Sequence, residues 1–308
     1  RDHLVPPVLE MGRQAMEVWE GAGVAIGALL AERWNLTVER VEVLAGGMNS
    51  RVWLVVADDI KLVVKSVDQA AAAFEFGLGL AARLDSAGIT TGAPVPSRSG
   101  ALVEAADDRL VALLQYIDGV PLTGMPANHK IIGTTLGRVH AISQDKPGDL
   151  SAWFELVTQF DEYLDYEPWI RSVVQNALDG VRELAAEQEL SWAGLHGDPA
   201  PEAFLQQPSG EVALIDWGGA MTGPALYDLA SAVMYLEGAQ VDLVAAYLAE
   251  RPESAAEVSA GLMPFLRFRW AVQASYFAWR CATDVRTGLS DDDGNAKGLA
   301  DARRSFGA

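Results

Sequence analysis

Residues 195–205, LHGDPAPEAFL, followed by residues 212–219, VALIDWGG, form the stretch that decides how this chain is interpreted. It holds two carboxylates, Asp198 and Asp216, each beside a short apolar run that predicts a strand. One carboxylate on a loop can orient or deprotonate a hydroxyl group, and a second at a strand end can hold a divalent metal against phosphates. The layout suits phosphoryl transfer. A plain turn, with Asp198 capping a backbone N–H, explains residues 196–198 alone but not the strand that returns so soon.

The composition is that of a folded, acidic protein. Of its 308 residues 50% are hydrophobic, enough for two lobes with cores of their own. The formal net charge of −19, from 23 Lys and Arg against 42 Asp and Glu, argues against a nucleic-acid partner. The acidity either steers cationic small molecules to the protein or serves only solubility.

The sequence predicts a cytoplasmic protein without membrane association. No uninterrupted apolar run approaches the roughly 18 residues that a membrane span needs, and residues 1–10 lack a signal-peptide core. Cys281 is the single cysteine, so an intramolecular disulfide is impossible, and we expect a packed core thiol. A monomer and a dimer both remain open.

The hydrophobic pattern predicts a sheet-containing lobe at residues 1–117 and a mostly helical lobe at 118–308, with Asp118 and Gly119 at the boundary. A helical segment is expected at about residues 8–35. The other expected elements of the first lobe are strands at 38–44, 52–56, 61–65, 93–96 and 110–117, and a helix at 70–87 that ends at Gly88.

A second set of polar residues in the first lobe is suited to a nucleotide. The segment Gly46-Gly47-Met48-Asn49-Ser50 lies between two predicted strands, where backbone N–H groups can approach phosphate oxygens. Two glycines also occur in ordinary hairpins. Lys65 ends a predicted strand, and Glu75, ten residues later, can pair with it and hold it toward phosphates; otherwise both are solvated surface residues.

Together these motifs resemble the aminoglycoside phosphotransferase and choline kinase-like enzymes, which have a protein-kinase-like fold. The resemblance covers about residues 40–240 and rests on His196-Gly197-Asp198 with Pro201, on residues 215–217, and on the segment GPALYDLA at 223–230. Residues 113–122 look like the family's hinge and residues 136–141 like its buried helix. It implies an α+β, bilobal fold, with a small N-lobe carrying an antiparallel sheet and a larger, mostly helical C-lobe.

The resemblance also implies roles for individual residues. Asp198 would be the catalytic base or hydroxyl-orienting residue, Asp216 the Mg²⁺ ligand, and Asp228 an architectural residue that steadies the catalytic loop. The residues implied to bind the nucleotide, ATP or GTP, are Gly46, Gly47, Asn49, Ser50, Lys65, Glu75, Gln115, Tyr116 and Ile117.

One position departs from the family pattern. The metal-binding Asn expected five residues after Asp198 is Ala203, which has no ligand atom. Three interpretations follow: Glu202 replaces the Asn as a metal ligand, one metal on Asp216 suffices, or the protein binds nucleotide and has lost activity. Some relatives, methylthioribose kinases among them, also lack this Asn, which favours an active kinase.

The acceptor is the part that the sequence predicts least. Asp161, Asp165 and Trp169, among alternating acidic and aromatic residues, could line a pocket for a polycationic compound, or form a solvated helix face. Arg267, together with Arg269 and Arg280, points instead to an anionic or neutral hydroxylated acceptor.

The predicted function is transfer of the γ-phosphoryl group of ATP or GTP to a hydroxyl of a small acceptor: an aminoglycoside or other antibiotic, a sugar or an amino alcohol. The alternatives are a nucleotide-binding pseudokinase, in which Ala203 weakens catalysis, and a helical ligand-binding protein without nucleotide.

Overall fold

A computed structural model of the protein describes residues 25–44, 50–68, 72–286 and 293–308. The described residues form two compact units, those of 1–70 with 94–116, and those of 71–93 with 117–308. This division differs from the predicted lobes at residues 71–93 and at Ile117, which group with the second unit.

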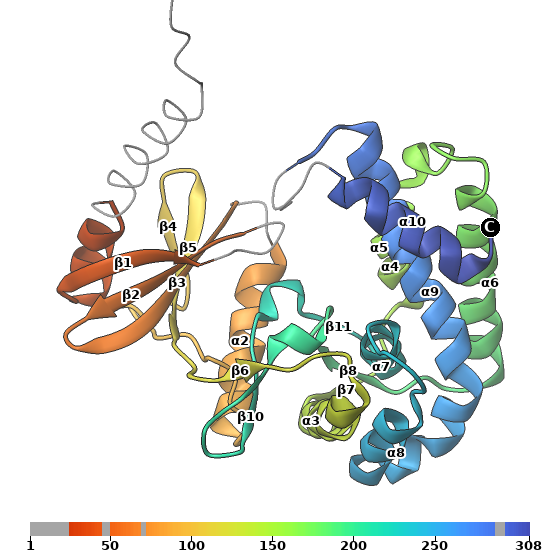
Figure 1. Ribbon diagram of the computed structural model, residues 1–308, viewed down its shortest axis with the longest axis horizontal. Helices are drawn as coiled ribbons and strands as arrows, with labels where there is room; N and C mark the ends of the chain where they lie inside the picture. The colour runs from red at the N-terminus through yellow and green to blue at the C-terminus, as the bar shows by residue number, and fades with distance from the viewer. Residues whose placement is uncertain (1–24, 45–49, 69–71, 287–292) are drawn as a thin grey trace, which may run out of the picture. The chain divides into compact units, whose positions relative to one another are not determined.

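The first unit contains a five-stranded antiparallel sheet in the order β1-β2-β3-β5-β4 (Figure 1). Its strands are β1 (Val38–Leu44), β2 (Ser50–Ala57), β3 (Ile60–Asp68), β4 (Glu104–Ala106) and β5 (Arg109–Gln115). The predicted turn at Asp58 and Asp59 joins β2 to β3, and both residues have positive φ, the conformation of a tight two-residue hairpin. The strand predicted at 93–96 is reduced to a single bridge between Pro94 and Leu114.

One face of this sheet is covered by a helix over residues 25–34. Leu30 and Trp34 of the helix pack with Val55, Val64 and Leu113, which alternate along their strands with residues of the other face. The helix predicted at about residues 8–35 is therefore described only over its last part, and residues 8–24 lie outside the described residues.

The second unit begins with α2 (Ala72–Ser86), whose end follows from its sequence. Gly88 has φ +90°, its N–H donates to the Asp85 carbonyl, and the Ile89 N–H donates to the Leu84 carbonyl. This is a Schellman motif, in which glycine takes the left-handed conformation without a steric penalty. The predicted stop at Gly88 is confirmed.

The rest of the second unit is mostly helical. Its longer helices are α3 (His129–Ile142), α6 (Ile170–Glu187), α7 (Ala225–Met234), α8 (Val241–Glu250), α9 (Ala255–Ala282) and α10 (Gly294–Phe306), and its short ones are α4 (Leu150–Trp153) and α5 (Glu155–Thr158). Helix α9 packs against α6, α7 and α10, and α3 packs against α8 (Figure 1). Among the described residues, no helix has the length and apolar character that a membrane crossing requires.

Two small antiparallel sheets carry the stretch at residues 195–219. Their strands are β6 (Val120–Pro121), β7 (Gln144–Asp145), β8 (Trp192–Leu195), β9 (Phe204–Gln206), β10 (Val212–Leu214) and β11 (Met221–Pro224), in the orders β10-β9-β6 and β11-β8-β7. The loop with Asp198 follows β8 and Asp216 follows β10, as the apolar runs predict.

Candidate active site

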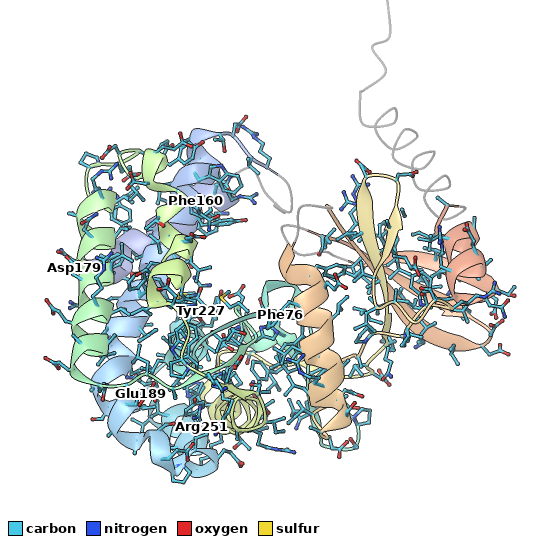
Figure 2. The ribbon with its side chains drawn as sticks, turned by 180° about the vertical axis from the view of Figure 1, so that it is seen from behind. Phe76, Phe160, Asp179, Glu189, Tyr227 and Arg251 are labelled. Carbon is cyan, nitrogen blue, oxygen red and sulfur yellow. The ribbon has the colours of Figure 1, made fainter. Side chains whose placement is uncertain are left out.

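Helix α7 is the scaffold of the candidate site. It carries Asp228 and Ser231, and Tyr235 follows as its C-cap residue. These positions, i, i+3 and i+7, lie on one face of a helix. Tyr227, labelled in Figure 2, is buried on the same helix and packs edge-on against Trp153. The α7 face therefore presents three polar groups from an otherwise apolar core.

Asp228 fixes the backbone of the loop that leads to Asp198. Its carboxylate is fully buried and accepts the N–H of His196 at 2.6 Å and the N–H of Gly197 at 2.9 Å. His140 Nε2 lies 3.3 Å from Asp228 Oδ2. Gly197 has φ +89°, and an added Cβ there would collide with the Gly219 carbonyl oxygen. The loop thus needs both the glycine and the buried acceptor, which agrees with the architectural role implied for Asp228.

The Asp198 carboxylate is held on one oxygen and open on the other. Tyr235 Oη donates to Asp198 Oδ1 at 2.6 Å, and Arg269 Nη2 donates to the same oxygen at 2.9 Å. Asp198 Oδ2 accepts no hydrogen bond from any described residue, and the side chain is 57% exposed. One oriented oxygen is therefore available to a hydroxyl from solvent.

Arg269, on α9, is a buried cation beside this carboxylate. Its Nε donates to Ser231 Oγ at 3.1 Å, and Ser231 Oγ in turn donates to the Tyr227 carbonyl at 2.8 Å. Burial disfavours its charge, but the neighbouring phenols and the Asp198 carboxylate outweigh that penalty, so the pKa of Arg269 is raised. Burial also raises the pKa of Tyr235, which keeps its phenol a hydrogen-bond donor.

Asp216 lies in a strained backbone position directly after β10. Its φ of 65° and ψ of 59° are left-handed, a conformation that Asp tolerates better than most residues and that tends to occur at functional sites. Flanking contacts hold the turn: Trp217 Nε1 donates to the Leu214 carbonyl at 2.8 Å, and His196 Nε2 lies 2.8 Å from the Ile215 carbonyl.

The donor set near Asp216 fits a hard cation such as Mg²⁺ only in part. Asp216 is exposed and offers carboxylate oxygens, and Mg²⁺ is often held by one or two carboxylates together with phosphates and water. Ala203 is buried, whereas Glu202, next to it in a 3₁₀ turn, is exposed. Adjacent residues in such a turn point about 120° apart, so Glu202 does not take the direction of the missing Asn. No cluster of three metal-binding side chains exists within the described ranges.

The nucleotide-binding residues predicted in the first unit lie on its sheet where they are described. Ser50 begins β2, and Lys65 is a buried residue of β3, paired in register with Val52 and Ala112. Gly46, Gly47 and Asn49 lie outside the described residues.

The predicted hinge and the predicted partner of Lys65 are divided between the units. Gln115 ends β5, and Tyr116 follows with Lys61 Nζ 5.2 Å from its ring centroid; both residues belong to the first unit. Ile117 and Glu75 belong to the second, where Glu75 is exposed in the first turn of α2.

The acidic residues predicted to bind the acceptor are paired with an arginine instead of standing open. Arg171 Nε donates to Asp165 Oδ1 at 2.7 Å, and its Nη1 donates to Asp161 Oδ1 at 3.0 Å. The Arg171 hydrogen bonds lower the pKa of Asp165. Trp169 Nε1 donates to Glu167 Oε2 at 2.6 Å. The three predicted residues lie on neighbouring turns. Within the part of the chain that the structure describes, none of them makes a hydrogen bond to Asp198, Tyr235 or Arg269.

Of the three arginines that the sequence indicates for an anionic or neutral acceptor, the one selected as a site residue, Arg267, is not the one that contacts Asp198. Arg267 is exposed on α9, while Arg269, two residues later, is buried. Arg269 lies four positions after Phe265, on the apolar face of the helix, and this spacing was the available signal. Tyr235 was missed, because nothing in its local sequence distinguishes it from a core tyrosine.

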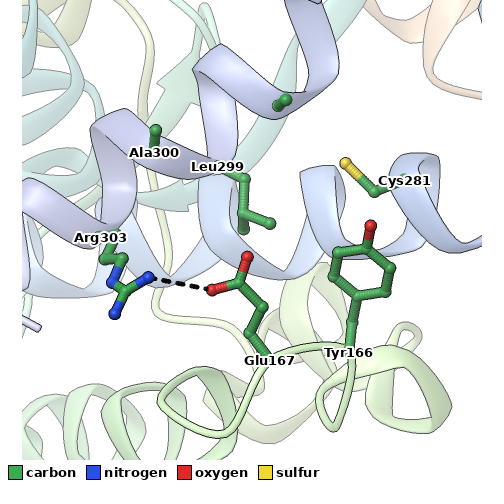
Figure 3. Close-up of a pocket in the computed structure, with 7 residues that line it drawn as sticks. Tyr166, Glu167, Cys281, Leu299, Ala300 and Arg303 are labelled. Carbon is green, nitrogen blue, oxygen red and sulfur yellow. Dashed lines mark ion pairs between the residues drawn. The ribbon is translucent and has the colours of Figure 1, made fainter.

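A separate cavity of about 140 Å³ lies among the loop at residues 166–167, the end of α9 and α10 (Figure 3). Tyr166, Cys281 and Leu299 line it, and Glu167 Oε2 lies 3.5 Å from Arg303 Nη1 across it. The thiol of Cys281 is half-buried here, and burial raises its pKa, so it is not activated.

Comparisons with known proteins find related sequences. The model of the phosphotransferase enzyme family matches residues 40–264. The homoserine kinase of Gluconobacter oxydans is 31% identical over 162 residues, which cover 50% of this chain and 51% of that protein. The homoserine kinase of Methylobacterium radiotolerans is 27% identical over 202 residues, which cover 60% and 63%. The chain thus spans between half and two thirds of the length of these relatives.

Solved structures with low sequence identity share the fold. A spectinomycin phosphotransferase in complex with ADP and spectinomycin has a TM-score of 0.64 at 15% identity, covering 92% of this chain and 94% of that one. The choline kinase of Streptococcus pneumoniae has a TM-score of 0.64 at 18% identity, covering 92% and 97%. The predicted α+β, protein-kinase-like fold is confirmed.

Proposed function

We propose that this chain, which belongs to the phosphotransferase enzyme family, transfers the γ-phosphoryl group of ATP or GTP to a hydroxyl group of a small acceptor. The observation that carries the proposal is the Asp198 carboxylate, fixed through Oδ1 by Tyr235 and Arg269 and open at Oδ2. The relatives named as homoserine kinases support a small hydroxylated acceptor.

In the proposed reaction Asp198 orients the acceptor hydroxyl and accepts its proton. Its Oδ2 accepts a hydrogen bond from the acceptor hydroxyl, orients the oxygen for attack and receives the proton as the phosphoryl group is transferred. Asp228 supports this role by holding the backbone of His196 and Gly197, which fixes the direction in which the Asp198 side chain points.

For the nucleotide, we assign Lys65 to the phosphates and the segment around Gln115 and Tyr116 to the base. Ser50 and Glu75 keep their predicted supporting roles. Asp216 would hold Mg²⁺, which neutralises phosphate charge when bound. Since Glu202 does not take the direction of the missing Asn in its 3₁₀ turn, one metal on Asp216 is the stronger of the alternatives.

A phosphoryl-transfer screen tests the proposal. Release of ADP or GDP is measured with Mg²⁺ over a panel of hydroxy amino acids, hydroxy acids, amino alcohols, sugars and aminoglycosides, with phosphorus NMR to identify the product. Acceptor-dependent turnover is expected in the wild type and in Arg138→Gln, an exposed helical arginine of the same unit, and not in Asp198→Asn.

The pseudokinase alternative rests on Ala203 and makes a different prediction. ATP or GTP with Mg²⁺ would raise the apparent melting temperature, because ligands that bind the folded state stabilise it, while no acceptor would consume nucleotide. Absence of any thermal shift with either nucleotide would reject both functions and leave a ligand-binding protein without nucleotide.

A further inference from the structure

We infer that Arg269 recognises a carboxylate on the acceptor, so that the substrate is a small alcohol bearing a carboxylate, such as a hydroxy acid or a hydroxylated amino acid. This inference rests on the proposed function, which leaves the acceptor open. It gives a specificity-determining role to a residue that the predicted catalytic set does not contain.

The first support is the unequal use of the guanidinium group. Arg269 Nε is taken by Ser231 Oγ, and Nη2 is shared between Asp198 Oδ1 at 2.9 Å and Tyr235 Oη at 3.1 Å. Nη1 makes no hydrogen bond to any residue that the structure describes. A planar guanidinium favours paired contacts with carboxylate or phosphate, so its remaining donors suit a second anion.

The second support is the distance to the reacting hydroxyl. That hydroxyl must come within about 3 Å of Asp198 Oδ2 to be oriented. Arg269 Nη2 lies 2.9 Å from the other oxygen of the same carboxylate. A charged group a few bonds from the hydroxyl is therefore close to the guanidinium, where a carboxylate is attracted and an ammonium repelled.

The third support is burial. Only 9% of the Arg269 side chain is exposed, whereas Asp198, its ion-pair partner, is more than half exposed. The Asp198 carboxylate is therefore partly solvated, and among the described residues it is the single carboxylate that hydrogen-bonds to the buried Arg269 cation. An acceptor carboxylate would supply a second anion, while the γ-phosphoryl group of the nucleotide is the other source that the test has to separate.

The test uses matched pairs that differ only in charge: homoserine with homoserine amide, and 4-hydroxybutyrate with 4-hydroxybutyramide. Binding to the purified full chain is measured by calorimetry in the presence of a non-hydrolysable ATP analogue and Mg²⁺, and KM and kcat are measured with ATP. The proteins are the wild type, Arg269→Gln, Arg269→Lys, and Arg138→Gln as the exposed control.

We expect the wild type and Arg138→Gln to bind each acid about 10- to 100-fold more tightly than its amide, the range for hydrogen bonds to charged groups. Arg269→Gln should bring the affinities for the acid and its amide to within about threefold of each other. It should also raise KM for the acid and leave KM for ATP unchanged. Arg269→Lys should keep part of the preference, because it keeps the charge and loses the planar fork.

Equal binding of acid and amide by the wild type would overturn the inference, and this arm does not depend on any variant folding. So would a preference that survives in Arg269→Gln, or a rise in KM for ATP with KM for the acid unchanged, which would assign Arg269 to the phosphoryl group. The calorimetry needs no turnover: if acids bind selectively and nothing is phosphorylated, the proposed function fails and the inference on Arg269 stands.

Discussion

Two arginine–aspartate clusters of the second unit are alike in chemistry and different in depth. Arg269 Nη2 lies 2.9 Å from Asp198 Oδ1, and Arg171 Nε lies 2.7 Å from Asp165 Oδ1. The Arg269 side chain is 9% exposed, whereas that of Arg171 is 37% exposed. Exposed pairs contribute little, because water solvates each partner well without the other, whereas a buried cation depends on the groups around it.

The buried Arg269–Asp198 cluster is better suited to select a ligand than the exposed Arg171–Asp165 cluster. In the exposed cluster Arg171 takes both oxygens of Asp165 and one of Asp161, so the acids already have their cation. In the buried cluster Asp198 keeps one oxygen open beside an arginine with unused donors. Asp161 and Asp165, predicted to bind the acceptor, are therefore weaker candidates than Arg269.

Replacing the central carboxylate should have the largest effect. Asp198→Asn keeps the shape of the side chain but cannot take a proton, so kcat should fall about 10²- to 10⁴-fold. Steady-state kinetics measures this, with the melting temperature confirming that the fold is retained. A kcat within a factor of a few of the wild type would remove Asp198 from the chemistry.

The support beneath that carboxylate should matter for stability. Asp228→Ala leaves the N–H groups of His196 and Gly197 without their buried acceptor and should cost about 3 to 5 kcal/mol in urea unfolding. The matched control is Asp179→Ala, an exposed aspartate on α6 labelled in Figure 2, which should change stability by less than about 0.5 kcal/mol. Similar values for the two variants would contradict the architectural role.

An alkaline titration should separate the clusters through their tyrosines. Burial raises the pKa of Tyr227 from 10.0 to about 12. With the folded pKa above the unfolded one, stability is intact below pH 10 and is lost as the pH rises toward 12, by roughly 2 to 3 kcal/mol. Urea unfolding from pH 9 to 11 should show a smaller loss in Tyr227→Phe than in the wild type. Tyr163→Phe, near the exposed cluster, should lose stability almost as the wild type does, because the hydrogen bond to Glu162 that raises the pKa of Tyr163 is exposed to solvent and contributes little.

The smallest effect is expected at the exposed cluster. Arg171→Gln should leave kcat/KM for the acceptor within about twofold, because the pair is solvated and binds no substrate in this interpretation. The pKa of Asp165 should rise toward its ordinary value, which carboxyl NMR can follow. A tenfold change in acceptor KM would instead return the acceptor to residues 161–169.

Local features were predictable from the sequence where a few neighbouring residues set the conformation. The hairpin at Asp58 and Asp59, the stop at Gly88 and the strand that ends before Asp216 all follow from nearby residues. The direction of the Glu202 side chain could not be predicted from nearby residues, because it depends on how the 3₁₀ turn at residues 201–203 packs. The roles of Ser50, Lys65 and Asp216 stay predictions.

The sequence by itself determined the fold class and the loop that holds Asp198. The motif at residues 195–219 is a local stretch, and its characteristic residues lie only a few positions apart. Only the tertiary structure decided what surrounds that carboxylate. Tyr235 and Arg269 reach Asp198 from 37 and 71 residues away, brought together by the packing of α7 against α9. Arg267 and Arg269 lie only two positions apart on α9, yet Arg267 is exposed and Arg269 is buried. The rotation of α9 about its axis in the packed core decides which of the two faces Asp198.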